Sequence, residues 1–80
     1  MPSVEVQAAA LAGMLAAATG NKPRTERTSA GIRVMADLPH QMGPAMRTAI
    51  LAALAQAPQY GHVHAAGTDT VWAFLPRVGL

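Results

Sequence analysis

The sequence predicts a small α+β protein, with an N-terminal helix followed by a β-α-β-β unit whose small three-stranded sheet carries a helix on one face. Three observations lead to this fold class. Residues 4–19 and 44–56 are rich in alanine and repeat larger apolar residues at helical spacing. Residues 31–38 alternate apolar and polar side chains, as a half-buried strand does. Residues 61–75 hold two further strand-like runs around a turn.

The 80 residues predict a single domain, 1–80, made of an N-terminal helix (1–20), a basic connector (21–30) and the β-α-β-β unit (31–80). A domain of this size buries only about 60% of the surface of its unfolded chain. Apolar residues make up 51% of the sequence, but alanine dominates, and Trp, Tyr and Phe each occur once. We therefore expect a second copy to contribute buried surface.

The first helix is expected from Val4 to Thr19, because Ser3 is a good N-cap and Gly20 a natural stop. Almost every side of this helix is apolar or small, which favours burial on all sides. The rest of the chain offers few bulky side chains to cover it, so the sequence predicts a homodimer. The expected interface residues on this helix are Ala9, Gly13, Ala17, Leu11 and Met14.

The segment GNKPRTERTSA, residues 20–30, is expected to be a polar connector without regular structure, since Gly20, Asn21 and Pro23 interrupt helices and strands. Together with Arg33, near the start of the following strand, this segment concentrates positive charge. A solvated connector is one interpretation, and a patch that binds phosphates is the other. The basic residues are Lys22, Arg24, Arg27 and Arg33, against the single acidic residue Glu26.

The run GIRVMADLP predicts a strand that ends before Pro39 and buries Ile32, Val34, Ala36 and Leu38. The second helix is expected to begin at Pro44 and to end near Gln56, because Pro58 prevents continuation.

A hairpin of strands 61–65 and 70–75 follows, and its turn length decides the register. A two-residue loop places Val63 and Ala65 with Trp72 and Phe74, and places the two histidines on the other face. A loop that is one residue longer or shorter places the histidines beside Trp72. The first register is preferred because it gathers the large residues in one core.

His62 and His64 are two residues apart and therefore share one face of a strand. With Asp69 or Asp37 they could bind a transition metal, but two histidines at this spacing are a weak signal. A half-exposed pair on a solvent or nucleic-acid face is the favoured interpretation. We predict no metal and no cofactor.

Catalysis is not expected. The chain has no cysteine, its serines Ser3 and Ser29 lie at a helix cap and in the connector, and its four acidic residues are dispersed. Glycines are spread along the chain and form no phosphate-binding loop. The sequence therefore predicts a protein that is not an enzyme and has no small-molecule substrate.

A membrane span needs about 20 apolar residues, and the sequence contains none of that length. The N-terminal segment also lacks the basic start of a signal peptide and carries Glu5 instead. We expect a cytoplasmic protein.

The leading functional hypothesis is a nucleic-acid-binding accessory or regulatory protein, acting as a homodimer through the basic connector and the sheet edge. Its phosphate contacts would be Lys22, Arg24, Arg27 and Arg33, with His62 and His64 contributing less. The helix 44–56 is not a recognition helix, because only Arg47 and Gln56 could reach base edges. Tyr60 and Trp72 could stack on bases, although core packing is favoured for both.

Two alternatives remain open. One is a protein–protein interaction or dimerisation module that uses the alanine face of the first helix and binds no nucleic acid. The weaker one is a metal-binding module built on the histidine pair.

The runs ERTSAGIRVMADLP and YGHVHAAGTDTVWAFLP are similar to segments of small proteins from actinobacteria and their plasmids or phages. They contain no catalytic motif, and the similarity implies neither a family nor a function.

Overall fold

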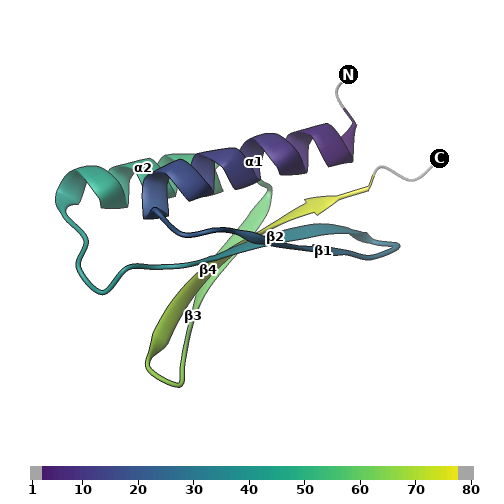
Figure 1. Ribbon diagram of the computed structural model, residues 1–80. Coiled ribbons are helices and arrows are strands. Elements are labelled where there is room, and N and C mark those ends of the chain that lie inside the picture. The colour runs from purple at the N-terminus through teal and green to yellow at the C-terminus, as the bar shows by residue number, and fades with distance from the viewer. Residues whose placement is uncertain (1–2, 78–80) are drawn as a thin grey trace.

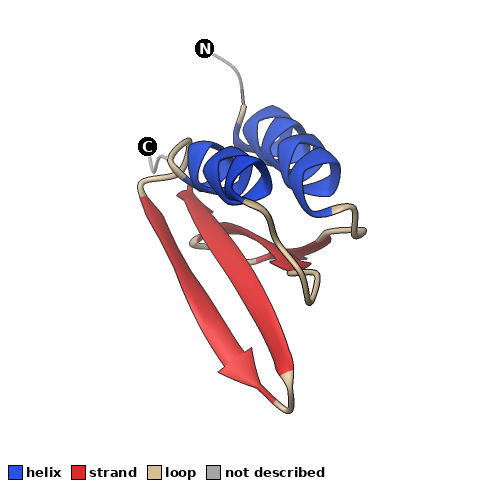
Figure 2. Ribbon diagram, turned by 90° about the vertical axis from the view of Figure 1, so that its left-hand side faces the viewer, coloured by secondary structure: helices blue, strands red, loops and turns tan. Residues whose placement is uncertain are grey.

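The computed structural model describes residues 3–77 and has an α+β fold, as expected, but its sheet has four strands rather than three (Figure 1). The neighbours in the sheet pair antiparallel in the order β1-β2-β4-β3. The elements are α1 (Val4–Thr19), β1 (Arg24–Arg27), β2 (Gly31–Asp37), α2 (Pro44–Leu54), β3 (Gln59–Ala65) and β4 (Thr68–Pro76). Both helices lie on the same side of the sheet (Figure 2).

Helix α1 has the bounds that its sequence predicts. The Ser3 hydroxyl accepts a hydrogen bond from the backbone N–H of Val6 at 3.2 Å, as an N-cap does. At the other end Gly20 takes a left-handed conformation, with φ 75°, and donates its N–H to the carbonyl of Ala16.

The expectation that residues 20–30 lack regular structure is wrong, because the centre of this segment forms strand β1. This strand pairs with β2 from Arg24, opposite Met35, to Arg27, opposite Ile32. The turn that follows is held by Thr28, whose N–H donates to the carbonyl of Gly31 at 2.8 Å. All four residues of β1 are exposed, so the strand carries no buried apolar pattern that its sequence could display.

The hairpin of β3 and β4 has the preferred register. Its turn consists of Ala66, with φ 53°, and Gly67, with φ 77°, and a pair of positive φ values is typical of a two-residue type I′ turn. His62 therefore pairs with Val71 and His64 with Asp69.

The expectation that the core lies on the hairpin face of Trp72 and Phe74 is wrong. Helices α1 and α2 pack on the face of Val71, Ala73 and Leu75, which are at most 5% exposed. Trp72 and Phe74 lie on the opposite face and are only partly buried.

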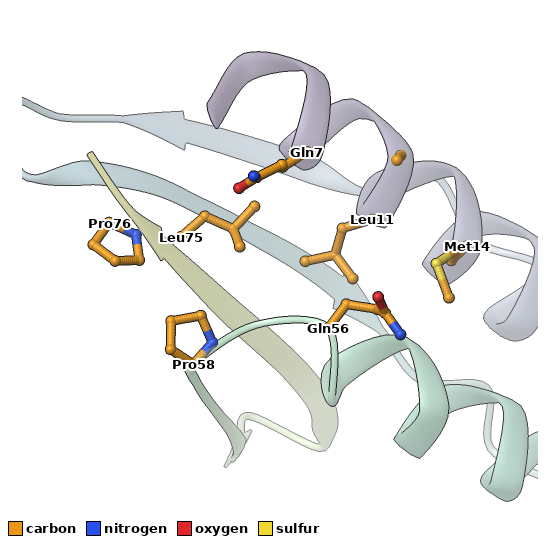
Figure 3. A pocket seen from close by; sticks show the side chains of 8 residues that line it. Gln7, Leu11, Met14, Gln56, Pro58, Leu75 and Pro76 are labelled. Carbon is orange, nitrogen blue, oxygen red and sulfur yellow. The ribbon is translucent and has the colours of Figure 1, made fainter. Parts of the chain in front are cut away.

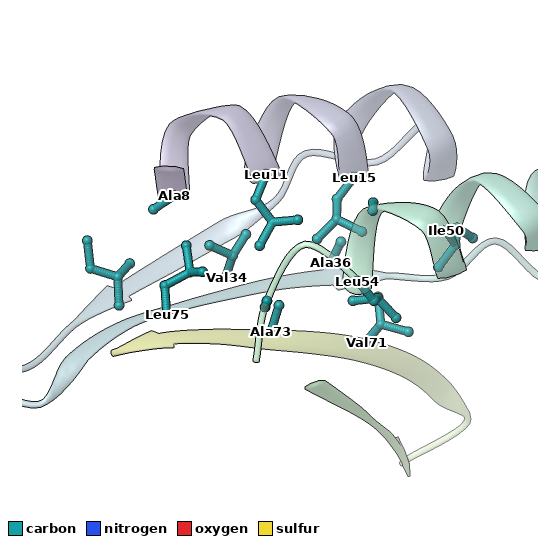
Figure 4. Packing of buried hydrophobic residues seen from close by; sticks show 13 residues of the cluster. Ala8, Leu11, Leu15, Val34, Ala36, Ile50, Leu54, Val71, Ala73 and Leu75 are labelled. Carbon is teal, nitrogen blue, oxygen red and sulfur yellow. The ribbon is translucent and has the colours of Figure 1, made fainter. Parts of the chain in front are cut away.

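The core lies between the sheet and the two helices (Figure 4). Its largest fully buried side chains are Leu11, Leu15, Ile32 and Val34, and alanines fill much of the remainder. Because Ala8, Ala36, Ala53 and Ala73 are small, helices and sheet approach closely and leave little volume for an aromatic ring.

The expectation that the chain cannot cover α1 is wrong for one stripe of this helix. Leu11 is 2% exposed and Leu15 is 0% exposed, so Leu11 belongs to the subunit's own core rather than to a surface that a partner could reach. Ala9, Gly13 and Ala17 are exposed on the outer side, and Met14 is 40% exposed. No helix within residues 3–77 has both the length and the apolar character that crossing a membrane requires.

Candidate nucleic-acid interface

The face of the sheet opposite the helices has no element packed on it among residues 3–77, and we call it the open face (Figure 2). The strand register decides which side chains it carries, because alternate residues of each strand point to the same side. The open face includes Arg24, Glu26, Arg33, Met35, Asp37, Val63, Thr70, Trp72 and Phe74.

Trp72 occupies the middle of the open face, on the central strand β4, between Met35 of β2 and Gly61 of β3. The absence of a side chain at Gly61 lets the indole ring lie across β3. A Cβ atom added at this glycine would be 2.7 Å from the ring. The Arg33 guanidinium lies over the indole, 5.4 Å from the ring centroid, in a cation–π arrangement.

Phe74 repeats this arrangement one pleat further along β4. An added Cβ at Gly31 would be 2.7 Å from the Cζ atom of the phenyl ring. Each ring of the open face thus lies against a glycine of a neighbouring strand, which explains why both are half-buried although no helix covers them.

Arg24 reaches the open face but is engaged in an ion pair. Its guanidinium is 3.2 Å from Oδ1 of Asp37, and this oxygen also accepts a hydrogen bond of 2.9 Å from the Thr70 hydroxyl. The hydrogen bond from Arg24 and, to a smaller extent, that from Thr70 lower the pKa of Asp37. Reciprocally, the hydrogen bond to Asp37 raises the pKa of Arg24.

The six residues predicted to contact nucleic acid do not form one patch. Arg24 and Arg33 share the open face, whereas Arg27 points to the helix side of β1. There the hydrogen bond from Arg77 lowers the pKa of Glu5, and the charge of Arg27 lowers it to a smaller extent. Lys22 is exposed before β1 and lines a polar hollow of about 530 Å³.

The two histidines lie on the helix side of β3, near the hairpin end that projects beyond the helices (Figure 1). Nε2 of His62 is 3.0 Å and Nδ1 of His64 is 2.7 Å from the same oxygen, Oδ1 of Asp69. The hydrogen bond from His64, followed by that from His62, lowers the pKa of Asp69. No group of histidine and carboxylate side chains within residues 3–77 is arranged to hold a metal ion.

A second hollow, of about 430 Å³, lies where α1 passes the end of α2 and strand β4 (Figure 3). Its lining residues are Gln7, Ala10, Leu11, Met14, Gln56, Pro58, Leu75 and Pro76. None of these carries an ionisable side chain, so the hollow provides no general acid, base or nucleophile.

Core packing was the favoured interpretation of Trp72, with base stacking as the alternative, whereas Phe74 was expected only in the core. Two signals could have located both on the open face. Trp72 and Phe74 alternate with the small aliphatic residues Val71 and Ala73, and a glycine occupies the neighbouring strand beside each ring.

The basic residues Arg24 and Arg33 and the aromatic residues Trp72 and Phe74 are therefore the groups that meet on one uncovered surface. No protein-family model matches the chain, and no curated protein or solved structure matches it either.

Proposed function

We propose that this protein is a non-catalytic accessory or regulatory protein of the cytoplasm that binds single-stranded nucleic acid on its open face. The observation that carries the proposal is the position of Trp72, half-buried at the centre of an uncovered sheet, with the Arg33 guanidinium 5.4 Å from its ring centroid. Aromatic rings and guanidinium planes on a sheet are the groups on which unpaired bases stack.

A base competes favourably with Arg33 for the indole ring. A cation–π contact at an exposed site contributes about 0.5–1 kcal/mol, whereas a stacked base contributes about 1–3 kcal/mol. The base therefore displaces the guanidinium from the ring, and the released guanidinium is then available to a phosphate of the same strand. Phe74 offers the next base a second ring along β4.

The charges of the open face favour few phosphate contacts. Arg24 is paired with Asp37, and Glu26 lies opposite Arg33 in the register of β1 and β2. With about two phosphates neutralised, the logarithm of the binding constant would fall against the logarithm of salt concentration with a slope of about −1.4. We therefore propose binding dominated by stacking, in place of the phosphate-dominated binding that the basic connector suggested.

A single strand suits this surface better than a duplex. In a duplex the base faces are stacked on each other, and a protein reads base edges through a helix or ribbon that enters a groove. The exposed residues of α2 include Arg47 but are mostly alanine and leucine, which supply few hydrogen-bond donors for base edges.

The proposal is tested by fluorescence anisotropy of a labelled oligothymidylate titrated with the protein at low and moderate salt. We expect Trp72→Ala to weaken binding by at least about fivefold, the lower end of the value of one lost stacking contact. Arg33→Ala should weaken it by a smaller factor, and Arg47→Ala is the matched control that should leave it unchanged. Glu26→Gln should strengthen binding, because it removes a negative charge beside the phosphates.

Binding that Trp72→Ala and Arg33→Ala leave intact would contradict an interface on the open face. No binding of any oligonucleotide would favour the alternative function, a protein–protein interaction module. The observation in favour of that alternative is the exposure of large apolar side chains, with Val6 58%, Leu51 55% and Val63 51% exposed.

A further inference from the structure

The two edges of the sheet differ in their protection against pairing with another strand. Strand β1, at one edge, has four residues, three of them charged. Strand β3, at the other edge, has seven residues, QYGHVHA, with no Asp, Glu, Lys, Arg or Pro. Each of the two edge strands directly follows a proline, Pro23 or Pro58, so proline does not distinguish them. Short length and charged side chains are usual devices that prevent edge pairing, and β1 has both whereas β3 has neither.

The backbone of β3 offers a regular row of hydrogen-bonding groups on its outer side. Residues that flank a two-residue turn form a hydrogen-bonded pair, so Ala65 pairs in this way with Thr68 of β4. Alternation along the ladder then directs the N–H and C=O groups of Tyr60, His62 and His64 away from β4. The carbonyl of Asp69, opposite His64, agrees with this pattern, because it accepts a hydrogen bond from Leu38 on the β2 side at 2.8 Å.

Apolar side chains border the same edge on both faces of the sheet. On the helix side, Tyr60 is 50% exposed and Leu51 of α2 is 55% exposed. Between them lies a hollow of about 400 Å³, lined mainly by apolar residues of α2, β3 and β4. On the open face, Val63 is 51% exposed. The unpaired backbone and the exposed apolar groups therefore coincide.

We infer that β3 pairs antiparallel with β3 of a second copy of this chain, about a two-fold axis at His62. This register places His62 opposite His62 of the second copy and Tyr60 opposite His64 of the second copy. It allows about six main-chain hydrogen bonds, two for each facing pair. The two four-stranded sheets become one continuous sheet with a joint open face.

A second copy is the favoured occupant because the edge is complementary to itself. Antiparallel pairing of a strand with its own copy has two-fold symmetry, the commonest symmetry of soluble dimers. The register also sets Gly61 opposite Val63 of the second copy, so the branched side chain comes beside the Trp72 indole that lies over Gly61. An interface of standard size takes about 800 Å² from each partner, and Leu51, Tyr60 and Val63 supply exposed apolar area beyond the strand itself.

The inference does not depend on nucleic-acid binding, and its test contains none. Sedimentation velocity of the full chain from about 1 to about 200 μM should show a monomer–dimer equilibrium. His62→Pro removes an N–H that points away from β4, so it should abolish the dimer and leave the circular dichroism spectrum unchanged. Val63→Glu should weaken the dimer at least tenfold. Gly13→Lys, on the outer side of α1, is the matched control that should preserve it.

Hydrogen exchange provides a second readout that does not depend on variants. The amides of Tyr60, His62 and His64 should exchange slowly at high protein concentration and quickly at low concentration, whereas the amide of Gly61, within the ladder to β4, should be protected at both. A monomer throughout the concentration range would overturn the inference. A dimer that Gly13→Lys disrupts and His62→Pro leaves intact would also overturn it, and would assign the interface to α1.

Discussion

The two faces of the sheet differ in a way that composition alone does not reveal. On the helix side, β2 and β4 contribute Ile32, Val34, Ala36, Val71 and Ala73, all at most 4% exposed. On the open face the same two strands contribute Met35 and the larger aromatic residues Trp72 and Phe74, all three only partly buried. Side-chain size therefore does not decide which face becomes the core. The thickness of the layer above it does, because alanine-rich helices lie too close to the sheet for an aromatic ring.

The largest expected effect on stability comes from shortening a buried side chain on the helix side. Leu15→Ala should lower the free energy of unfolding by about 2–5 kcal/mol, because Leu15 is fully buried and its removal leaves a cavity. Met14→Ala, one residue earlier and 40% exposed, is the matched control and should change it by less than about 0.5 kcal/mol. Urea denaturation followed by circular dichroism measures both. Equal losses from the two variants would show that α1 does not pack on the sheet in this orientation.

The next effect concerns the glycines beneath the open-face rings. An added Cβ at Gly31 would meet the Leu75 carbonyl oxygen and lie 2.9 Å from Cα of Pro76, so Gly31→Ala must move backbone. We expect it to destabilise the protein by about 1–3 kcal/mol, the usual cost of overpacking.

Gly61→Ala differs from Gly31→Ala, because the three atoms nearest to the added Cβ all belong to the Trp72 indole, at 2.7 Å. An aromatic side chain on an uncovered face can tilt outward, and replacing a strand glycine is itself favourable by about 0.5–1 kcal/mol. We expect a net loss of stability smaller than that of Gly31→Ala, together with a red shift of the fluorescence of Trp72, the only tryptophan in the chain. An unchanged emission maximum would contradict the position of the ring against Gly61.

Local signals predicted the elements that they control. Ser3 and Gly20 fixed both ends of α1, and the alternation from Ile32 to Ala36 identified β2 and its buried side. The two-residue turn at Ala66 and Gly67 sets the hairpin register, but this register was preferred for a different reason, a core of large residues, which the structure does not have. Each of these features depends on residues within a few positions of one another.

Features set by distant parts of the chain were not predictable in the same way. Strand β1 forms because β2 offers it a backbone ladder, and its exposed charged residues resemble a connector. The choice of core face depended on how closely two helices approach the sheet. The composition of the candidate site also depends on distant parts of the chain. Arg24 and Arg33 were identified as basic residues, but only the register shows that they share the open face with Trp72, while Arg27 turns to the other side.

The smallest expected effect concerns the acidic residues on either face, Asp37 on the open face and Asp69 on the helix side. Hydrogen bonds from Arg24 and then Thr70 lower the pKa of Asp37, and those from His64 and then His62 lower the pKa of Asp69. A carboxyl whose pKa is lower in the folded protein stabilises the fold above its unfolded pKa of about 4 and loses this contribution as the pH falls through the folded value. Stability should therefore decline below about pH 4.

Asp37→Asn separates the two acidic residues. It should lower the stability near pH 6 and have progressively less effect toward pH values of about 2, where the native carboxyl is also neutral. Because the Arg24 side chain is 54% exposed, solvent screens the pair, and the loss should be small and should shrink further in high salt. Urea denaturation of the native protein and the variant between these pH values measures the difference. A difference that stays constant over the whole range would show that the Asp37 side chain acts through its hydrogen bonds and not through its charge.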